Sequence, residues 1–135
     1  MKTLIKNTLL IYLLLNLFSC SDGIVSELPD NHVIKIRANY SSIQKEIFNQ
    51  YCIGCHSGKF PSGNLNLSEG VSYANLINKE NNDKTAKYIV QSNVADSYII
   101  ERLTSSTNPM PPTGKIDQAL IDTLKLWIGN GAISD

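Results

Sequence analysis

Apolar residues recur at helical spacing in two long segments of the chain. In the first segment Ile43, Ile47 and Tyr51 follow one another at intervals of four, which predicts an amphipathic helix. A serine at position 41 or 42 is its expected N-cap. We expect this helix to run directly into Cys52.

The last part of the chain predicts a second amphipathic helix. Asp117 is the expected N-cap, and Gly129 and Gly131 are expected to end the helix. Its buried face, at a period of 3.6 residues, is expected to consist of Leu120, Ile121, Leu124, Trp127 and Ile128.

Weaker patterns fill the middle of the chain. Residues 68–77 and 96–104 predict two short helices, and residues 88–90 form a β-prone run. In the second short helix we expect Glu101 and Arg102 to face solvent. The side chains expected to face inward there are Tyr98, Ile99 and Leu103. The predicted fold class is all-α, a small helical domain with short irregular or β-like segments.

Residues 1–19 have the organisation of a secretion leader. Two lysines precede an apolar run at residues 9–15, which is too short to span a bilayer comfortably. Residues 17–20 then resemble a bacterial lipobox, in which Cys20 becomes the first mature residue and carries acyl chains. A plain secretion signal, or an uncleaved membrane anchor with a spare cysteine, is the alternative.

The predicted organisation has three parts: the leader at 1–19, the lipidated Cys20 with a flexible tether at 20–38, and a folded domain at 39–135. We expect the protein to be exported and held by lipid on a bacterial membrane, on the periplasmic or cell-surface side. Removal of the leader leaves ten basic against twelve acidic residues. No basic patch is visible, which argues against a nucleic-acid partner.

The first predicted helix leads into Cys52-Ile53-Gly54-Cys55-His56, which has the C-x-x-C-H form of a c-type haem attachment site. Cys52 and Cys55 can form thioethers with the two vinyl groups of one haem, and His56 can then give the iron an imidazole nitrogen. A structural disulfide or a Cys/His zinc pair is the alternative. With Cys20 acylated, haem attachment also leaves no cysteine of the chain unassigned.

A second informative stretch is the loop Asn108-Pro109-Met110-Pro111-Pro112. Met110 is the only methionine once the leader is removed, and three prolines stiffen the backbone around it. We predict that Met110 is the second axial ligand of the iron; the alternative is a methionine that fills an irregular gap in the core. His32 lies in the tether and is predicted to be solvated rather than a ligand. Leu65 and Leu67 are predicted to pack on the porphyrin.

These features together resemble a class I c-type cytochrome over about residues 39–133. The second half is more specifically similar to the planctomycete-type cytochrome c domain. The matching stretches are residues 63–67 (Gly-Asn-Leu-Asn-Leu), residues 96–103 (Asp-Ser-Tyr-Ile-Ile-Glu-Arg-Leu), Met110-Pro111-Pro112, and Trp127-Ile128 with Gly131-Ala132.

The resemblance implies one covalent haem c between the first helix, the last helix and a long methionine loop. It implies that Cys52 and Cys55 attach the haem, that His56 is the proximal ligand and that Met110 is the distal ligand. In many class I cytochromes a proline about a dozen residues after the histidine accepts the ring N–H through its carbonyl. The nearest proline here is Pro61, so we expect the acceptor to be a backbone carbonyl between Pro61 and Leu65.

The predicted function is one-electron transfer in an exported, membrane-anchored chain, by a protein without a catalytic cluster of its own. The expected partners are redox proteins, the membrane that holds the lipid anchor, and the haem maturation machinery. A haem-based sensor, or an accessory docking module of a partner oxidoreductase, is the alternative. A thiol–disulfide oxidoreductase is disfavoured because the sequence around Cys52 and Cys55 has no βαβ pattern.

Overall fold

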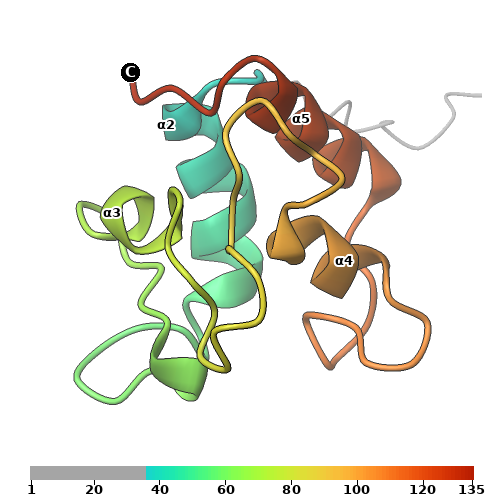
Figure 1. The fold of residues 1–135 in the computed structure, drawn as a ribbon. Helices are drawn as coiled ribbons and strands as arrows, with labels where there is room; N and C mark the ends of the chain where they lie inside the picture. Colours follow the sequence, from blue (N-terminus) through green and yellow to red (C-terminus); the bar gives the residue numbers. More distant parts are fainter. Residues whose placement is uncertain (1–35) are drawn as a thin grey trace, which may run out of the picture. The chain divides into compact units, whose positions relative to one another are not determined.

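The computed structural model describes residues 36–135. The predictions for the leader, Cys20, His32 and most of the tether therefore lie outside the described residues. The elements are helix α2 (Tyr40–Ile43), π-helix η2 (Gln44–Cys52), the single 3-10 turn η3 (Ser62–Asn64), and helices α3 (Ser72–Leu76), α4 (Tyr98–Thr104) and α5 (Gln118–Gly129) (Figure 1). Within residues 36–135, β-structure is limited to isolated bridges such as the one between Ile77 and Ile89. This mostly helical content is compatible with the predicted all-α class.

The first long helix is built from α2 and η2 in direct succession and ends at Cys52, as predicted. Its N-cap is Asn39, whose backbone is extended and whose side-chain oxygen accepts the Ser42 N–H at 3.1 Å. The prediction of a serine cap at position 41 or 42 was therefore wrong. Asparagine is among the best N-capping residues. With the cap at Asn39, the helix begins at Tyr40, earlier than a cap at Ser41 or Ser42 would allow.

The wide turn of η2 is seen in the bond from the Ile53 N–H to the Phe48 carbonyl, 3.0 Å long and five residues back. On the buried side of this helix, the Gln44 amide donates to the Leu67 carbonyl at 3.0 Å. This bond attaches the helix to the segment that follows His56. The apolar face predicted from the sequence is buried here at Ile43 and Ile47.

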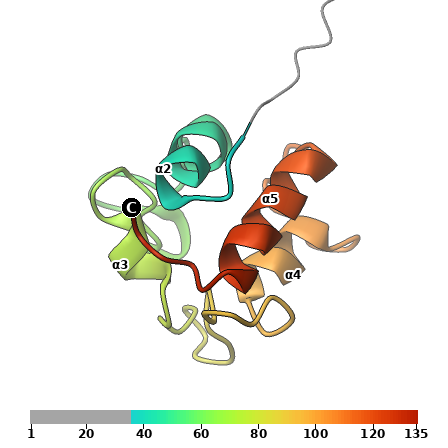
Figure 2. The same cartoon turned by 90° about the horizontal axis from the view of Figure 1, so that it is seen from above.

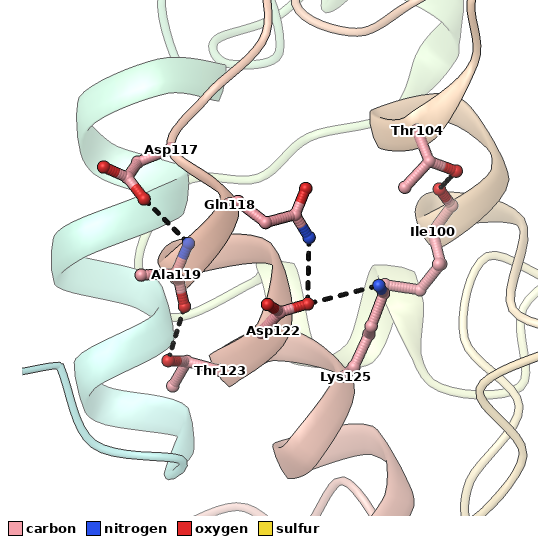
Figure 3. Close-up of polar contacts among 8 residues, drawn as sticks. All are labelled: Ile100, Thr104, Asp117, Gln118, Ala119, Asp122, Thr123 and Lys125. Atoms are coloured by element: carbon pink, nitrogen blue, oxygen red, sulfur yellow. Dashed lines mark hydrogen bonds and ion pairs between the residues drawn. The ribbon is translucent and has the colours of Figure 1, made fainter.

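Helix α5 begins where the sequence predicts. The Asp117 carboxylate accepts the Ala119 N–H at 2.7 Å, and on the solvent side the Gln118 amide and the Lys125 ammonium both donate to Asp122 (Figure 3). All five residues predicted for its buried face are buried: Leu120, Ile121, Leu124, Trp127 and Ile128.

The end of α5 is a Schellman motif. The Gly131 N–H donates to the Ile128 carbonyl at 3.0 Å, and the Ala132 N–H donates to the Trp127 carbonyl at 2.8 Å. Gly131 has a φ of +101°, a backbone conformation in which glycine is favoured because it has no Cβ. The sequence prediction that Gly131 helps to stop this helix agrees with the structure.

The short elements follow the predicted order. Helix α4 starts after Ser97, but the Ser97 hydroxyl bonds to the Asn93 carbonyl (2.7 Å) and the Val90 N–H (3.0 Å) and does not cap the helix. Residues 88–90, which were predicted to be β-prone, do not form a strand. They are held by isolated bridges and by single hydrogen bonds such as the one from the Val90 N–H to the Ser97 hydroxyl.

Helix α5 contacts both α2 and α4 (Figures 1 and 2). The rings of Tyr40 and Trp127, with centroids 5.9 Å apart, join the first and last helices, and Tyr73 packs edge-on against Tyr40. The C-terminal end of η2 and the two long loops, before η3 and before α5, lie at the same end of the domain (Figure 1). No helix within residues 36–135 is both long enough and apolar enough to cross a bilayer.

Candidate functional site

A cavity of about 310 Å³ lies at the loop-bearing end of the domain. This volume is in the range of about 300–1,000 Å³ that is typical of small-molecule and cofactor sites. Most of the wall is apolar. The lining residues come from η2, the segment 55–67, α3, residues 81–88, α4 and the loop before α5, and none comes from α5 itself. The apolar face of the last helix is buried in the core instead.

The cavity brings together all six residues that the sequence assigned to the folded domain's site. They are Cys52, Cys55, His56, Leu65, Leu67 and Met110. Met110 lies in the loop between α4 and α5, more than fifty residues after His56 in the sequence, and lines the same cavity. Their roles in attachment and ligation remain predictions.

The C-x-x-C-H segment forms a tight turn at the end of η2. The Cys52 carbonyl accepts both the Cys55 N–H at 3.1 Å and the His56 N–H at 2.9 Å. Both cysteines are free thiols, with Cys52 partly buried and Cys55 exposed. The turn thus presents two thiols and one imidazole to the same cavity without a disulfide between the thiols.

Burial raises the pKa of the Cys52 thiol to about 12. At neutral pH this thiol is therefore protonated in the folded chain. A thiol–disulfide oxidoreductase needs an attacking thiol with a lowered pKa, because the thiolate is the nucleophile. The environment of Cys52 thus argues against that function.

His56 is held from its ring and from its backbone. The ring atom Nδ1 lies 3.3 Å from the Leu65 carbonyl oxygen, which falls in the range predicted for the acceptor. With Nδ1–H as the donor, the lone pair of Nε2 is free to bind a metal. The His56 carbonyl also accepts the Leu67 N–H at 2.7 Å.

Met110 is positioned by its own backbone. Its N–H donates to the Arg102 carbonyl at the end of α4, at 2.9 Å. The loop is fastened a second time by the Asn108 N–H, which donates to the Ser105 hydroxyl at 3.0 Å. The partly buried Met110 side chain is in the cavity wall.

Two polar groups of the cavity wall were not predicted. Arg102 was expected to face solvent, but it lines the cavity and its Nε atom is buried. Asn81 is 4% exposed, and its side-chain oxygen accepts the N–H groups of Thr85 and Ala86. The position of Arg102 could have been predicted from its four-residue spacing from Tyr98, which was expected to face inward. Such a spacing places both residues on one helical face. Asn81 has no comparable signal.

The residues present fit a covalently attached haem c. Two thiols, an imidazole and a thioether are the groups with which c-type proteins attach and ligate the haem, and they share one mainly apolar cavity. The buried Arg102 Nε has no hydrogen-bond partner among the described residues.

Comparison with known proteins agrees with this fit. Residues 52–114 match the family model described as planctomycete cytochrome C. The match covers 63 of the 135 residues and supports a planctomycete-type cytochrome c domain in this part of the chain. This likeness suggests haem binding and a role in electron transfer. No curated protein and no solved structure matches the chain significantly.

Proposed function

We propose that this protein is a single-haem c-type cytochrome that carries one electron at a time in an exported, membrane-anchored electron-transfer chain. The observation that carries this proposal is the convergence of the C-x-x-C-H turn and Met110 on one cavity. A haem held there supplies a reversible one-electron change between ferrous and ferric iron.

Four side chains of the cavity would hold the haem in this proposal. Cys52 and Cys55 would attach it through thioethers, and His56, through Nε2, and Met110, through its sulfur, would be the ligands of its iron. A neutral thioether ligand favours the ferrous state and raises the reduction potential. The apolar wall, which includes Leu65 and Leu67, excludes water and acts in the same direction.

The membrane attachment in this proposal rests on the sequence pattern alone. Acylation of Cys20 would hold the protein on the periplasmic or cell-surface side, and residues 20–38 would connect the anchor to the domain. Redox proteins are the proposed partners, and the haem maturation machinery is needed to form the thioethers.

The proposal is tested by producing the exported protein in a host that matures c-type cytochromes. We expect one haem per chain that survives acid–acetone extraction and gives a pyridine haemochrome spectrum of a doubly attached haem. A variant with both Cys52→Ala and Cys55→Ala is the matched control and should lose the haem on extraction. A colourless wild-type protein would contradict the proposal.

A haem-based sensor or an accessory docking module is the second candidate. The partial exposure of Met110 and its position in a loop are the features that favour it, since such a ligand can be displaced. Carbon monoxide discriminates between the two candidates. Slow or absent binding by the reduced wild type agrees with a carrier, whereas rapid binding favours the sensor.

A further inference from the structure

Residues 65–67 carry the backbone acceptor for the His56 ring but belong to no helix or strand of the described chain. The Leu65 carbonyl lies at the ring nitrogen Nδ1, and the Leu67 N–H donates to the His56 carbonyl at 2.7 Å. A segment outside regular secondary structure depends on other groups to bind its backbone. The orientation of the His56 ring therefore depends on what holds residues 65–67 in place.

The Gln44 side chain holds one end of this segment. It is 4% exposed, and its amide nitrogen donates to the Leu67 carbonyl at 3.0 Å and to the Asn49 side-chain oxygen at 2.7 Å. Its oxygen accepts the hydroxyls of Ser72 and Tyr40. An amide group has two N–H donors and two acceptor sites on its oxygen, so all four are used. The Gln44 amide is therefore held in one orientation, with one N–H directed at Leu67.

Asn75 holds the middle of the segment from a second helix, α3. Its partly buried amide donates to the Asn66 carbonyl at 2.8 Å. Neither Gln44 nor Asn75 lines the cavity, so neither side chain touches the cavity's occupant. Any effect of the two amides on that occupant must pass through residues 65–67.

We propose that Gln44 and Asn75 are positioning residues for His56. Through the carbonyls of Leu67 and Asn66 they keep the Leu65 carbonyl in line with the ring N–H. This bond fixes the orientation of a ligand histidine and raises its basicity, and a more basic ligand favours ferric iron. The inference rests on the proposed ligation of a haem iron by His56.

The test compares four variants of the mature, haem-loaded protein. Gln44→Leu and Asn75→Ala each remove one donor to the segment. Ser72→Ala removes a bond to Gln44 but leaves both donors, and Gln50→Leu replaces an exposed glutamine of the same helix, η2. The readouts are the midpoint potential and the hydrogen exchange of the His56 ring N–H in the reduced protein, followed by nuclear magnetic resonance.

The ring N–H of Trp127 is the internal reference for exchange. It donates to the Ile133 carbonyl at 2.9 Å, and neither residue lines the cavity. A general loss of stability would speed the exchange of both ring protons by the same factor, because both would then exchange through global opening. The ratio of the two rates therefore separates positioning of His56 from stability of the fold.

We expect Gln44→Leu and Asn75→Ala to raise the ratio of His56 to Trp127 exchange about tenfold, as the loss of one buried hydrogen bond would do. Ser72→Ala and Gln50→Leu should keep the wild-type ratio. Gln44→Leu should also shift the ferrous-to-ferric equilibrium about threefold toward ferrous, because the imidazole becomes a weaker donor to the iron.

A wild-type ratio in both Gln44→Leu and Asn75→Ala would overturn the inference and leave the two amides as structural contacts. A change confined to one variant would remove the other amide from this role. If Gln44→Leu does not retain its fold, Asn75→Ala decides by the same ratio. Absence of covalent haem in the wild type would instead refute the proposed function.

Discussion

At the scale of single residues, the two candidate axial ligands are positioned by backbone carbonyls. The Leu65 carbonyl orients the His56 ring, and the Arg102 carbonyl holds the N–H of Met110. Both acceptors lie outside the ligands' own helices or turns. The position of each ligand therefore depends on a neighbouring segment of the chain.

Replacement of Met110 tests the sulfur ligand. Met110→Ala should lower the midpoint potential and allow the reduced protein to bind carbon monoxide rapidly, because one axial position of the iron is then open. Absorbance spectroscopy and carbon monoxide mixing measure both effects. Met110→Leu is the matched control for volume and should show the same loss of ligation, with a change in stability below about 1.5 kcal/mol. An unaltered spectrum in both variants would exclude Met110 as a ligand.

The sequence was sufficient to predict the chemically distinctive residues of the cavity, because C-x-x-C-H and a proline-flanked methionine are distinctive patterns. It did not predict Arg102, since charged residues of short helices usually face solvent. Whether such a residue is inside or outside depends on the path of the loop that packs against it. Asn108, which pairs with Arg102, belongs to such a loop, and its path is not encoded by a local pattern.

At the scale of the elements, the sequence predicted the last helix more completely than the first. The N-cap, the five buried residues and the glycine stop of α5 follow local rules that act within one or two turns. The π-helical form of η2 does not follow from such a rule. The buried bond from Gln44 to the Leu67 carbonyl shows that distant segments help to define this helix.

The N-cap of α5 can be measured directly. Asp117→Ala should destabilise the haem-loaded protein by about 1 kcal/mol, because the Ala119 N–H loses its acceptor (Figure 3). Thr123→Ala is the control on the same helix. Its hydroxyl is exposed and bonds only to the Ala119 carbonyl, so a change within about 0.5 kcal/mol is expected. Denaturant unfolding followed by circular dichroism gives both values; equal effects would contradict the assignment of Asp117 as the cap.

The two glycines at the end of α5 should respond in opposite directions to alanine. Gly131→Ala introduces a Cβ at a φ of +101° and should cost about 1–2 kcal/mol. Gly129 is helical, and a Cβ there would meet Val94 at an ordinary 3.8 Å. Gly129→Ala should therefore stabilise the protein by up to about 1 kcal/mol. Unfolding free energies measure the pair, and effects of the same sign would be inconsistent with this helix end.

At the scale of the whole molecule, the cavity lies within the hydrophobic core, because several residues of the buried cluster form its wall. Phe48, Leu67, Leu76 and Leu103 belong to the buried cluster and also line the cavity. A domain of about 100 residues buries a modest apolar area. Its fold should therefore depend strongly on the group that fills this space.

Removal of the haem tests this dependence. The double variant Cys52→Ala and Cys55→Ala, freed of haem, should show no cooperative thermal transition, because the apolar wall of the cavity is then open to water. Differential scanning calorimetry against the haem-loaded wild type measures the difference. A cooperative, native-like transition of the haem-free protein would mean that the helices are stable without the cofactor.

The loop that follows the C-x-x-C-H turn is closed on that turn at several points. The Ser62 N–H donates to the Cys55 carbonyl at 2.9 Å, and Leu65 and Leu67 bond to the ring and carbonyl of His56. Surface loops generally tolerate insertions at little energetic cost. One residue added between Pro61 and Leu65 would instead move the acceptor away from the imidazole. Under the proposed ligation of iron by His56, such an insertion should alter the ligand field of the iron, seen by electron paramagnetic resonance, while barely changing the helical content. The length of this loop would then be constrained by the electronic structure of the cofactor.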